Sequence, residues 1–424
     1  MIGQAQRTRQ GRRRRRKRRR RQGHNESSAE NDRSSKDERS PVPRKKGNLI
    51  SDDEKVRAST RSPSTHDDTI GHFRGEQGTI IADRFRIIRD VGIGTFGRVV
   101  ECFDLDSRLS RGRDRSRRGE GRDYVAIKIV RNVKRYYESA LVEARIIDDV
   151  NRRGGRGMSH CVILQESFTF QKHYCMVFER LGPSLYDFLK RHEYQPFPLK
   201  CVQDFAVQLL ETLEFLHSFR LIHTDLKIEN ILLMNDREVT YANQRLPEST
   251  RIKLIDFGGA CYDSDKKSSI INTRQYRAPE VILGIGWSMP SDMWSLGCIL
   301  AELLLGELLF ATHDNLEHLA LIERTISSFP MWMLKKARSN SRSQLADEAF
   351  STRGYHRMQE VLPAESASFV NSSPPLGSLF RRQEDAWFLD LLRKILVIDP
   401  YERATAYECL QFLSRIGRNV VRYC

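Results

Sequence analysis

At residues 223–230 the chain reads His-Thr-Asp-Leu-Lys-Ile-Glu-Asn. This spacing puts a carboxylate, Asp225, two positions before Lys227 and five positions before Asn230. Asp225 is suited to accept the proton of a hydroxyl group, Asn230 to hold a magnesium ion, and Lys227 to steady a phosphoryl group in transfer. The segment therefore predicts a catalytic loop, in which Thr224 stands where an arginine is usual.

A glycine-rich segment lies upstream, where residues 92–99 read Gly-Ile-Gly-Thr-Phe-Gly-Arg-Val. Glycines let a backbone close over phosphates without Cβ clashes. Alone, the pattern fits an ordinary hairpin, a dinucleotide loop or a nucleotide cover, but a dinucleotide loop needs a helix directly after it. The following Val-Val-Glu-Cys-Phe, residues 99–103, favours a strand instead. We therefore expect a hairpin over a nucleotide, with the binding residues Val91, Gly92, Ile93, Gly94, Thr95, Phe96, Gly97, Arg98 and Val99.

A lysine follows within the apolar run Val-Ala-Ile-Lys at residues 125–128. A buried lysine without a partner is costly, and a phosphate together with a carboxylate removes that cost. Glu143 is the preferred partner because its helical turn also carries Ile147, which would pack inward, while Glu138 is the competitor. The nucleotide site is thus expected to include Ala126, Lys128 and Glu143.

Asp256-Phe257-Gly258 follows the apolar residues 252–255, and Ala278-Pro279-Glu280 comes later. Asp-Phe-Gly alone is a common turn, but in this position Asp256 is expected to be the second magnesium ligand. A catalytically inactive protein with the same motifs is excluded, because the sequence offers a candidate residue for every role in phosphoryl transfer. Two further residues are expected to be structural, with Arg403 pairing with Glu280 and Asp292 supporting the backbone of the catalytic loop.

Element patterns give the fold class. Short β-type runs at residues 85–90, 99–103 and 124–130 precede a helical period at 136–150, and helical patterns dominate after about residue 180. This order predicts an α+β fold with a strand-rich small lobe and a helical large lobe. Residues 107–123, with seven arginines, are expected to form a flexible surface loop inserted into a hairpin, and residues 335–378 an irregular insertion.

From about residue 80 to 415 the chain resembles a eukaryotic protein kinase, with an antiparallel-sheet N-lobe and a helical C-lobe. Within the kinases it resembles the LAMMER (Cdc-like) family. The resemblance is carried by Thr224, by Thr-Arg-Gln-Tyr-Arg-Ala-Pro-Glu at 273–280, by Gly-Trp-Ser at 286–288 and by Glu-His-Leu-Ala-Leu-Ile-Glu-Arg at 317–324. The last segment is similar to the signature E-H-L-A-M-M-E-R. It departs from the signature at Leu321 and Ile322, apolar swaps that should preserve the packing.

The resemblance implies a bound ATP, Mg²⁺, and phosphorylation of serine and threonine on substrates and of tyrosine in autophosphorylation. It implies Arg/Ser-rich splicing factors as substrates, and a role in pre-mRNA splicing. It further places Phe178 as gatekeeper and adds four nucleotide-contacting residues: Glu179, Leu181, Ser184 and Asp187. Arg180 replaces an apolar residue of the family in the hinge, Ile228 replaces a proline and Asn272 a serine. Because Thr224 replaces the arginine that contacts a phosphorylated activation loop, this loop should need no phosphate to organise the site.

Charge is uneven along the 424 residues. Residues 1–80 hold 22 Lys/Arg against 11 Asp/Glu, so they contribute +11 of the net +16. We expect residues 1–80 to be a disordered tail and residues 81–418 to be the kinase domain, with the N-lobe at about 81–178 and the C-lobe at about 182–418. The basic run Arg12–Arg21 predicts nuclear import, with shuttling to the cytoplasm as an option, or weak binding of RNA and other polyanions.

Other features limit the partners. The eight cysteines contain no C-x-x-C pair and are expected to be reduced thiols. No apolar stretch approaches the ~20 residues that span a membrane, so we expect no membrane partner. As the family resemblance implies, we expect protein substrates, and we expect the chain to be a monomer. Two alternatives stay open: a related dual-specificity or proline-directed kinase with other substrates, and an RNA- or scaffold-binding protein that works through the basic tail.

Overall fold

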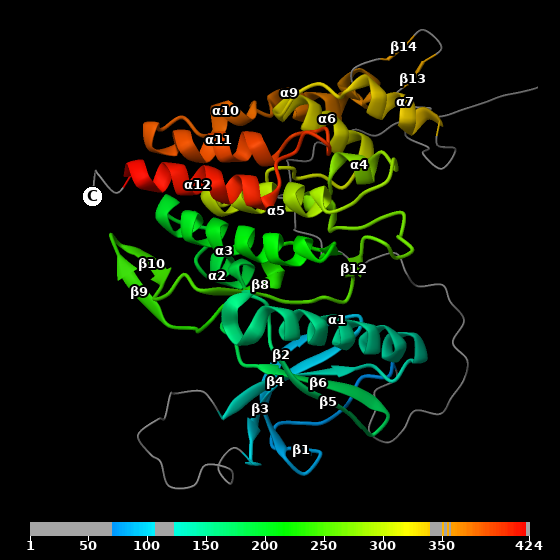
Figure 1. The fold of residues 1–424 in the computed structure, drawn as a ribbon, viewed down its shortest axis with the longest axis vertical. Coiled ribbons are helices and arrows are strands. Elements are labelled where there is room, and N and C mark those ends of the chain that lie inside the picture. The colour runs from blue at the N-terminus through cyan, green and yellow to red at the C-terminus, as the bar shows by residue number, and fades with distance from the viewer. Residues whose placement is uncertain (1–69, 107–122, 340–349, 352–353, 356–357, 421–424) are drawn as a thin grey trace, which may run out of the picture. The chain divides into compact units, whose positions relative to one another are not determined.

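The computed structural model describes residues 70–106, 123–339, 350–351, 354–355 and 358–420. Most of the predicted tail, including Arg12–Arg21, lies outside the described residues, as does the predicted insertion except for Asp123. In the described part, a small lobe of strands at the N-terminal end is followed by a large lobe of helices (Figure 1). The predicted fold class is therefore confirmed.

The small lobe is built on one antiparallel sheet of six strands in the order β1-β2-β3-β4-β6-β5. The strands are β1 (Ile80–Ile81), β2 (Phe85–Ile93), β3 (Gly97–Asp104), β4 (Tyr124–Val130), β5 (Leu164–Phe170) and β6 (His173–Glu179). The three predicted strands are confirmed, and β4 has the predicted bounds. Because side chains alternate along a strand, Val125, Ile127 and Ile129 of β4 all point to the same face of the sheet, where they are buried in the apolar core of the small lobe. The same alternation turns Ala126 and Lys128 to the opposite face of β4.

The small lobe begins earlier than predicted. Phe73 is buried and packs edge-on against Phe170, with ring centroids 5.9 Å apart. Asn132 N donates to Gly71 O at 2.8 Å, which fixes this segment beside the end of β4. Assigning residues 70–80 to the tail was therefore wrong, because a buried aromatic ring and a backbone hydrogen bond anchor a segment whose composition is mostly polar.

Helix α1 (Lys134–Met158) lies across the sheet on the side that faces the large lobe (Figure 1). Ala140, Ala144 and Tyr136 pack against Tyr174 and Met176 of β6. The helix extends beyond the predicted end at residue 150. Its Gly154 leaves no room for a side chain, since a Cβ there would lie 2.8 Å from the Cβ of Ser159. This glycine serves close packing and does not end the helix.

The large lobe consists of helices around one extensive apolar core. The helices are α2 (Leu185–Arg191), α3 (Leu199–Ser218), α4 (Pro279–Ile282), α5 (Pro290–Leu305), α6 (Asn315–Thr325), α7 (Met331–Ser339), α9 (Ala364–Ser372), α10 (Leu376–Leu379), α11 (Ala386–Ile395) and α12 (Ala406–Val420). Helix α5 is buried along most of its length, in line with the apolar sequence of residues 299–309. No helix in the described part of the chain is long and apolar enough to cross a membrane.

Short strand pairs complete the large lobe. These are β7 (Leu221–Ile222) with β12 (Cys261–Tyr262), β8 (Ile231–Leu233) with β11 (Ile252–Leu254), β9 (Glu238–Tyr241) with β10 (Gln244–Pro247), and β13 (Phe350–Ser351) with β14 (Gly354–Tyr355). The stretch 335–378 is less irregular than predicted, because α9 and α10 form within it. Val370 and Leu376 from these helices are buried in the large core, although flanking serines and prolines hide the helical pattern.

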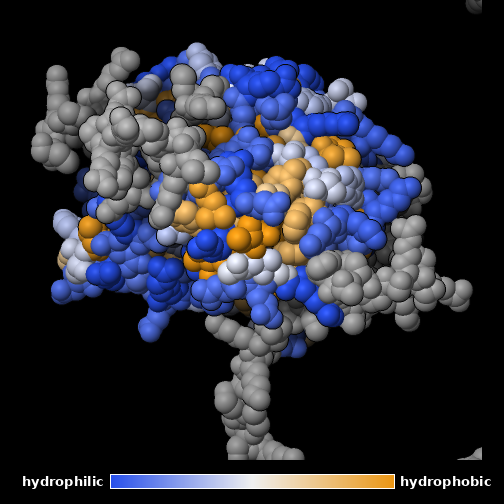
Figure 2. All heavy atoms as spheres, turned by 90° about the horizontal axis from the view of Figure 1, so that it is seen from below, coloured by the Kyte–Doolittle hydropathy of each residue, from blue (hydrophilic) through white to orange (hydrophobic). Residues whose placement is uncertain are grey.

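The face seen from the small-lobe end is mainly hydrophilic, with apolar residues exposed near its middle (Figure 2). The seven cysteines in the described part are free thiols, as predicted, and four of the buried ones are Cys102, Cys161, Cys175 and Cys298. Burial raises the pKa of the Cys102, Cys161 and Cys175 thiols to about 12, so they stay protonated at neutral pH.

Candidate active site

A cavity of about 1060 Å³ lies between the two lobes, under the turn that joins β2 to β3. The turn is closed by Gly94 N, which donates to Gly97 O at 2.9 Å. At Gly97 a Cβ would lie only 2.4 Å from Ile129 O, so only glycine permits this approach of β3 to β4. From the other side, Arg131 holds the turn by hydrogen bonds to the carbonyls of Thr95 and Phe96.

The predicted nucleotide residues converge on this cavity with one exception. Those that line it are Val91, Gly92, Ile93, Gly94, Thr95, Phe96, Gly97, Val99, Ala126, Lys128, Glu143, Glu179, Leu181, Ser184 and Asp187. Arg98 does not, because its side chain pairs with Asp90 at 2.5 Å and bonds the carbonyls of Phe73 and Gly75. The prediction for Arg98 is therefore corrected, since this side chain anchors the segment that precedes β1.

Lys128 and Glu143 meet at the back of the cavity. Lys128 Nζ lies 2.7 Å and 2.9 Å from the two carboxylate oxygens of Glu143, which confirms the preferred partner over Glu138. Asp256 Oδ1 is 3.7 Å from the same nitrogen. Burial acts to lower the pKa of Lys128, but the charges of Glu143 and Asp256 outweigh it and raise the pKa. Lys128 is thus held as a cation whose position is fixed from two elements.

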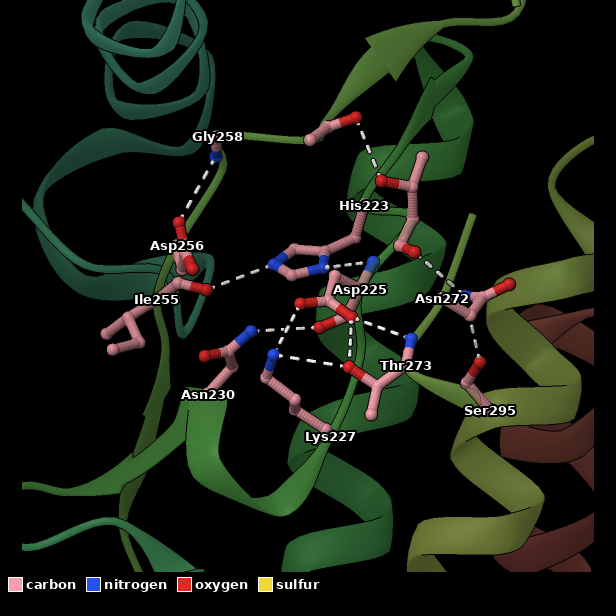
Figure 3. A network of polar contacts seen from close by, with 12 residues as sticks. His223, Asp225, Lys227, Asn230, Ile255, Asp256, Gly258, Asn272, Thr273 and Ser295 are labelled. Atoms are coloured by element: carbon pink, nitrogen blue, oxygen red, sulfur yellow. Dashed lines mark hydrogen bonds and ion pairs between the residues drawn. The ribbon is translucent and has the colours of Figure 1, made fainter. Parts of the chain in front are cut away.

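The catalytic loop brings Asp225, Lys227 and Thr273 together (Figure 3). Asp225 Oδ2 accepts from Lys227 Nζ at 2.6 Å, and Oδ1 accepts from the backbone N and the hydroxyl of Thr273 at 3.0 and 2.8 Å. Burial acts to raise the pKa of Asp225, but the hydrogen bonds and charge of Lys227, with Thr273, lower it overall. The carboxylate is therefore ionised and able to take a proton.

Asp292 supports this loop as predicted. The carboxylate is fully buried at the start of α5, and it accepts from His223 N at 2.8 Å and from Thr224 N at 3.0 Å. These bonds hold Thr224 with φ at 70°, a left-handed conformation that is uncommon for a threonine. This turn directly precedes Asp225 and therefore helps to orient its side chain.

Thr224 also joins both ends of the segment that runs from Gly259 to Asn272. Thr224 Oγ1 donates to Gly259 O at 2.8 Å, and Thr224 O accepts from the backbone N and the side-chain amide of Asn272, each at 2.9 Å. Asn272 is one of the departures from the family pattern, and here it fixes the far end of the segment. Uncharged groups make all three bonds.

Asn230 and Asp256, which the sequence predicts to be metal ligands, both line the cavity. Asn230 donates through its amide nitrogen to Asp225 O at 2.9 Å, so the oxygen end of the amide is directed away from that carbonyl (Figure 3). The described residues hold no group of three or more His, Cys, Asp or Glu that could bind a metal by themselves. One carboxylate and one amide oxygen suit Mg²⁺, which keeps several waters and binds phosphate oxygens.

Sequence reasoning missed Glu229 as a cavity residue, although it directly precedes Asn230. It lies in a short 3₁₀ turn, Ile228–Asn230, and its Oε2 is buried without a hydrogen-bond partner among the described residues. Burial raises the pKa of Glu229, and the carboxylates of Asp225 and Asp187 add to the shift. Its position within the catalytic loop was the available signal, but a glutamate in a loop usually faces solvent.

Residues 317–324 lie in α6 and contribute mainly to the core. Leu321 and Ile322 are buried, so the two apolar swaps keep their packing role. His318 is fully buried against Phe310, and burial, with the charges of Arg277 and Arg274, lowers its pKa to about 3. The segment thus supports the large lobe without lining the cavity.

Comparison with known proteins gives consistent results. Residues 85–413 match the protein kinase domain. The chain is 40% identical to the serine/threonine-protein kinase AFC3 of Arabidopsis thaliana, with 82% of this chain and 86% of AFC3 covered. It is 39% identical to the dual specificity protein kinase CLK2 of Homo sapiens (84% and 69%) and to lkh1 of Schizosaccharomyces pombe (82% and 49%). A crystal structure of a kinase domain at 36% identity superposes with a TM-score of 0.70, covering 82% of this chain and all of that domain.

Proposed function

Because this chain belongs to the LAMMER (Cdc-like) family of dual-specificity protein kinases, we propose that it phosphorylates Arg/Ser-rich splicing factors, with Mg²⁺ as its metal. The activity rests on one observation above all. A fixed lysine and one metal-ligand candidate, Lys128 and Asp256, line two cavities in common. The second metal-ligand candidate, Asn230, lines the larger of these cavities, and the carboxylate base, Asp225, lines the smaller one. The chain transfers the terminal phosphoryl group of ATP to hydroxyls of proteins.

Each residue has a part in the proposed reaction. Asp225 accepts the proton of the substrate hydroxyl, for which its lowered pKa keeps it ionised. Lys227, 2.6 Å from Asp225, carries a positive charge next to the attacking oxygen and the group in transfer. Lys128 holds the phosphates from the back of the cavity. Asn230 and Asp256 would hold Mg²⁺, which neutralises charge that develops on the phosphates when it is bound.

Glu229 supports an arginine-containing substrate. Its carboxylate is partly buried, one of its oxygens has no partner among the described residues, and other acids lie near it. A buried carboxylate is costly without a cation. Arginine offers a planar group that binds a carboxylate through two parallel hydrogen bonds. We propose that an arginine of the substrate, near the acceptor serine, binds Glu229.

A peptide array separates this proposal from the alternative of a proline-directed kinase. Arg-Ser repeat peptides are expected to be phosphorylated with kcat/KM at least about tenfold above that of matched peptides with lysine for arginine, because only arginine binds bidentately. A requirement for proline directly after the acceptor serine would reject the proposed substrates and leave the kinase assignment intact.

Glu229→Gln tests the arginine site. The amide keeps the size of the side chain and removes its charge, so KM for an Arg-Ser repeat peptide is expected to rise about 10- to 100-fold. KM for ATP, and kcat/KM for a serine peptide without arginine, should stay within about twofold. Glu211→Gln, an exposed glutamate of α3 that does not line the cavity, is the control. An equal loss on both peptides would assign Glu229 to the fold of the loop.

The remaining proposals concern the whole protein. We propose that it acts in the nucleus, shuttling with the cytoplasm, as a monomer, and that the tail binds RNA or other polyanions weakly. The support is the basic run Arg12–Arg21. Removing residues 1–69 should change localisation and substrate capture and leave catalysis on short peptides unaltered, since the described small lobe begins at residue 70.

A further inference from the structure

The hinge between the lobes carries a charged side chain, Arg180, directly after β6. Its guanidinium reaches two carboxylates on opposite sides. Arg180 Nε lies 3.2 Å from Glu101 Oε1 of β3, in the small lobe, and Arg180 Nη2 lies 2.8 Å from Asp236 Oδ2, after β8 in the large lobe. One side chain thus connects both lobes across the joint between them.

The contact continues into the sheet. Glu101 is only 6% exposed, and its second oxygen lies 2.5 Å from Arg89 Nη2 of β2. The resulting chain of four charges, Arg89–Glu101–Arg180–Asp236, lines one side of the ATP cavity. A buried carboxylate such as Glu101 requires cationic partners, so the small-lobe end of the chain is firmly held. The pKa of Asp236 is lowered by its hydrogen bond from Arg180, which agrees with a formed ion pair at the other end.

The ion pairs that connect the two lobes through Arg180, here called the tie, are expected to affect the binding of ATP more than the rate of phosphoryl transfer. The hydrogen-bond partners of Arg180 in the described part of the chain are Glu101 and Asp236, and do not include Asp225 or Lys128. It restricts how far β3 can move from the loop after β8, and so reduces the range of cavity widths that the free enzyme adopts. A site that is held near its bound shape loses less conformational freedom when the ligand enters, and therefore binds more tightly.

We propose that Arg180 is a positioning residue that ties the two lobes through Glu101 and Asp236 and presets the cavity for ATP. This inference rests on ATP binding in the cavity and is independent of which protein is the substrate. An apolar residue at position 180 would contact neither acid. The tie therefore depends on the guanidinium of Arg180.

The test compares four variants: Arg180→Leu, Arg180→Lys, Asp236→Ala and the double variant Arg180→Leu/Asp236→Ala. Arg180→Leu is expected to raise KM for ATP, and the dissociation constant of ADP measured by calorimetry, about 3- to 10-fold, while kcat stays within about twofold. Asp236→Ala should do the same, and the double variant should add little to either single change. Arg180→Lys should recover only part of the affinity for ATP. Lysine keeps the positive charge, but its single ammonium group cannot bond both carboxylates as the two nitrogens of the guanidinium do.

Arg237→Leu is the matched control. Arg237 pairs with Glu248 at 2.7 Å, an ion pair of similar length that stays within the large lobe and crosses no joint. KM for ATP should be unchanged in this variant. Raising the salt concentration should raise KM for ATP in the wild-type protein and much less in Arg180→Leu, because salt weakens the partly exposed pair with Asp236.

Three results would overturn the inference: an unchanged KM for ATP in Arg180→Leu, additive effects on KM in the double variant, or a fall of kcat in Arg180→Leu as large as the rise of its KM for ATP. Arg180→Leu also leaves the buried Glu101 with a single partner and can lower stability. The unfolding temperature is therefore measured beside each KM. If the unfolding temperature of Arg180→Leu falls, the inference is tested with Asp236→Ala alone, because that variant changes a half-exposed side chain.

Discussion

Asp225→Asn is expected to lower kcat about 10²- to 10⁴-fold on an Arg-Ser repeat peptide, the range for loss of a general base. An amide cannot take up the proton of the attacking hydroxyl. The change in kcat is measured by the incorporation of labelled phosphate from radiolabelled ATP into the peptide. KM for ATP should stay within about twofold, because the predicted ATP contacts, Lys128 and the turn between β2 and β3, line a cavity that Asp225 does not line.

Asp390→Asn is the control for this variant. Asp390 lies on α11 with its side chain 56% exposed, and it forms an ion pair with Arg393. The same chemical change there should leave kcat unaltered. Activity of Asp225→Asn equal to that of the wild-type protein would show that the base has been wrongly assigned, whatever the identity of the substrate.

Arg403→Met is expected to reduce the free energy of unfolding by about 3–5 kcal/mol, the cost of leaving a buried charge without its partner. Arg403 donates to both carboxylate oxygens of Glu280 at 2.8 and 2.9 Å, and the exposed fractions of the two side chains are 0% and 1%. The predicted pair is thus confirmed as fully buried. Urea unfolding followed by circular dichroism measures the loss.

The matched control is Arg393→Met, which breaks an ion pair with Asp390 whose side chains are both more than half exposed. Its expected cost is below about 1 kcal/mol. Adding Glu280→Leu to Arg403→Met should recover much of the stability, since no charge is then left buried. If Arg403→Met and Arg393→Met cost the same, the buried pair does not stabilise the large lobe.

The catalytic residues were predictable because the chemistry fixes both their type and their order. A proton acceptor, a lysine with a carboxylate partner and oxygen ligands for a metal leave few substitutes, so Asp225, Lys128 and Asp256 stand out in the sequence. The strands around the glycine turn were predictable for a similar reason. Their alternation of buried and exposed side chains is short, regular and bounded by glycine.

Other features depend on tertiary contacts that a sequence pattern does not carry. Arg98 follows a glycine motif, but its direction is set by Asp90 and by carbonyls near Phe73. The inclusion of residues 70–80 in the small lobe depends on the buried ring of Phe73 and on hydrogen bonds from Asn132 and Arg98 to backbone carbonyls of this segment. Arg180 was recognised as a departure from the family pattern, yet its partners Glu101 and Asp236 lie 79 and 56 residues away.

The anchoring of the Gly259–Asn272 segment by Thr224 has a consequence for control. Its three hydrogen bonds join neutral groups, so neither ionic strength nor the removal of a charge weakens them. Enzymes that add or remove phosphate have no ion pair to act on at this point. This part of the enzyme therefore reaches its working shape through folding itself, with no added phosphate group to complete it.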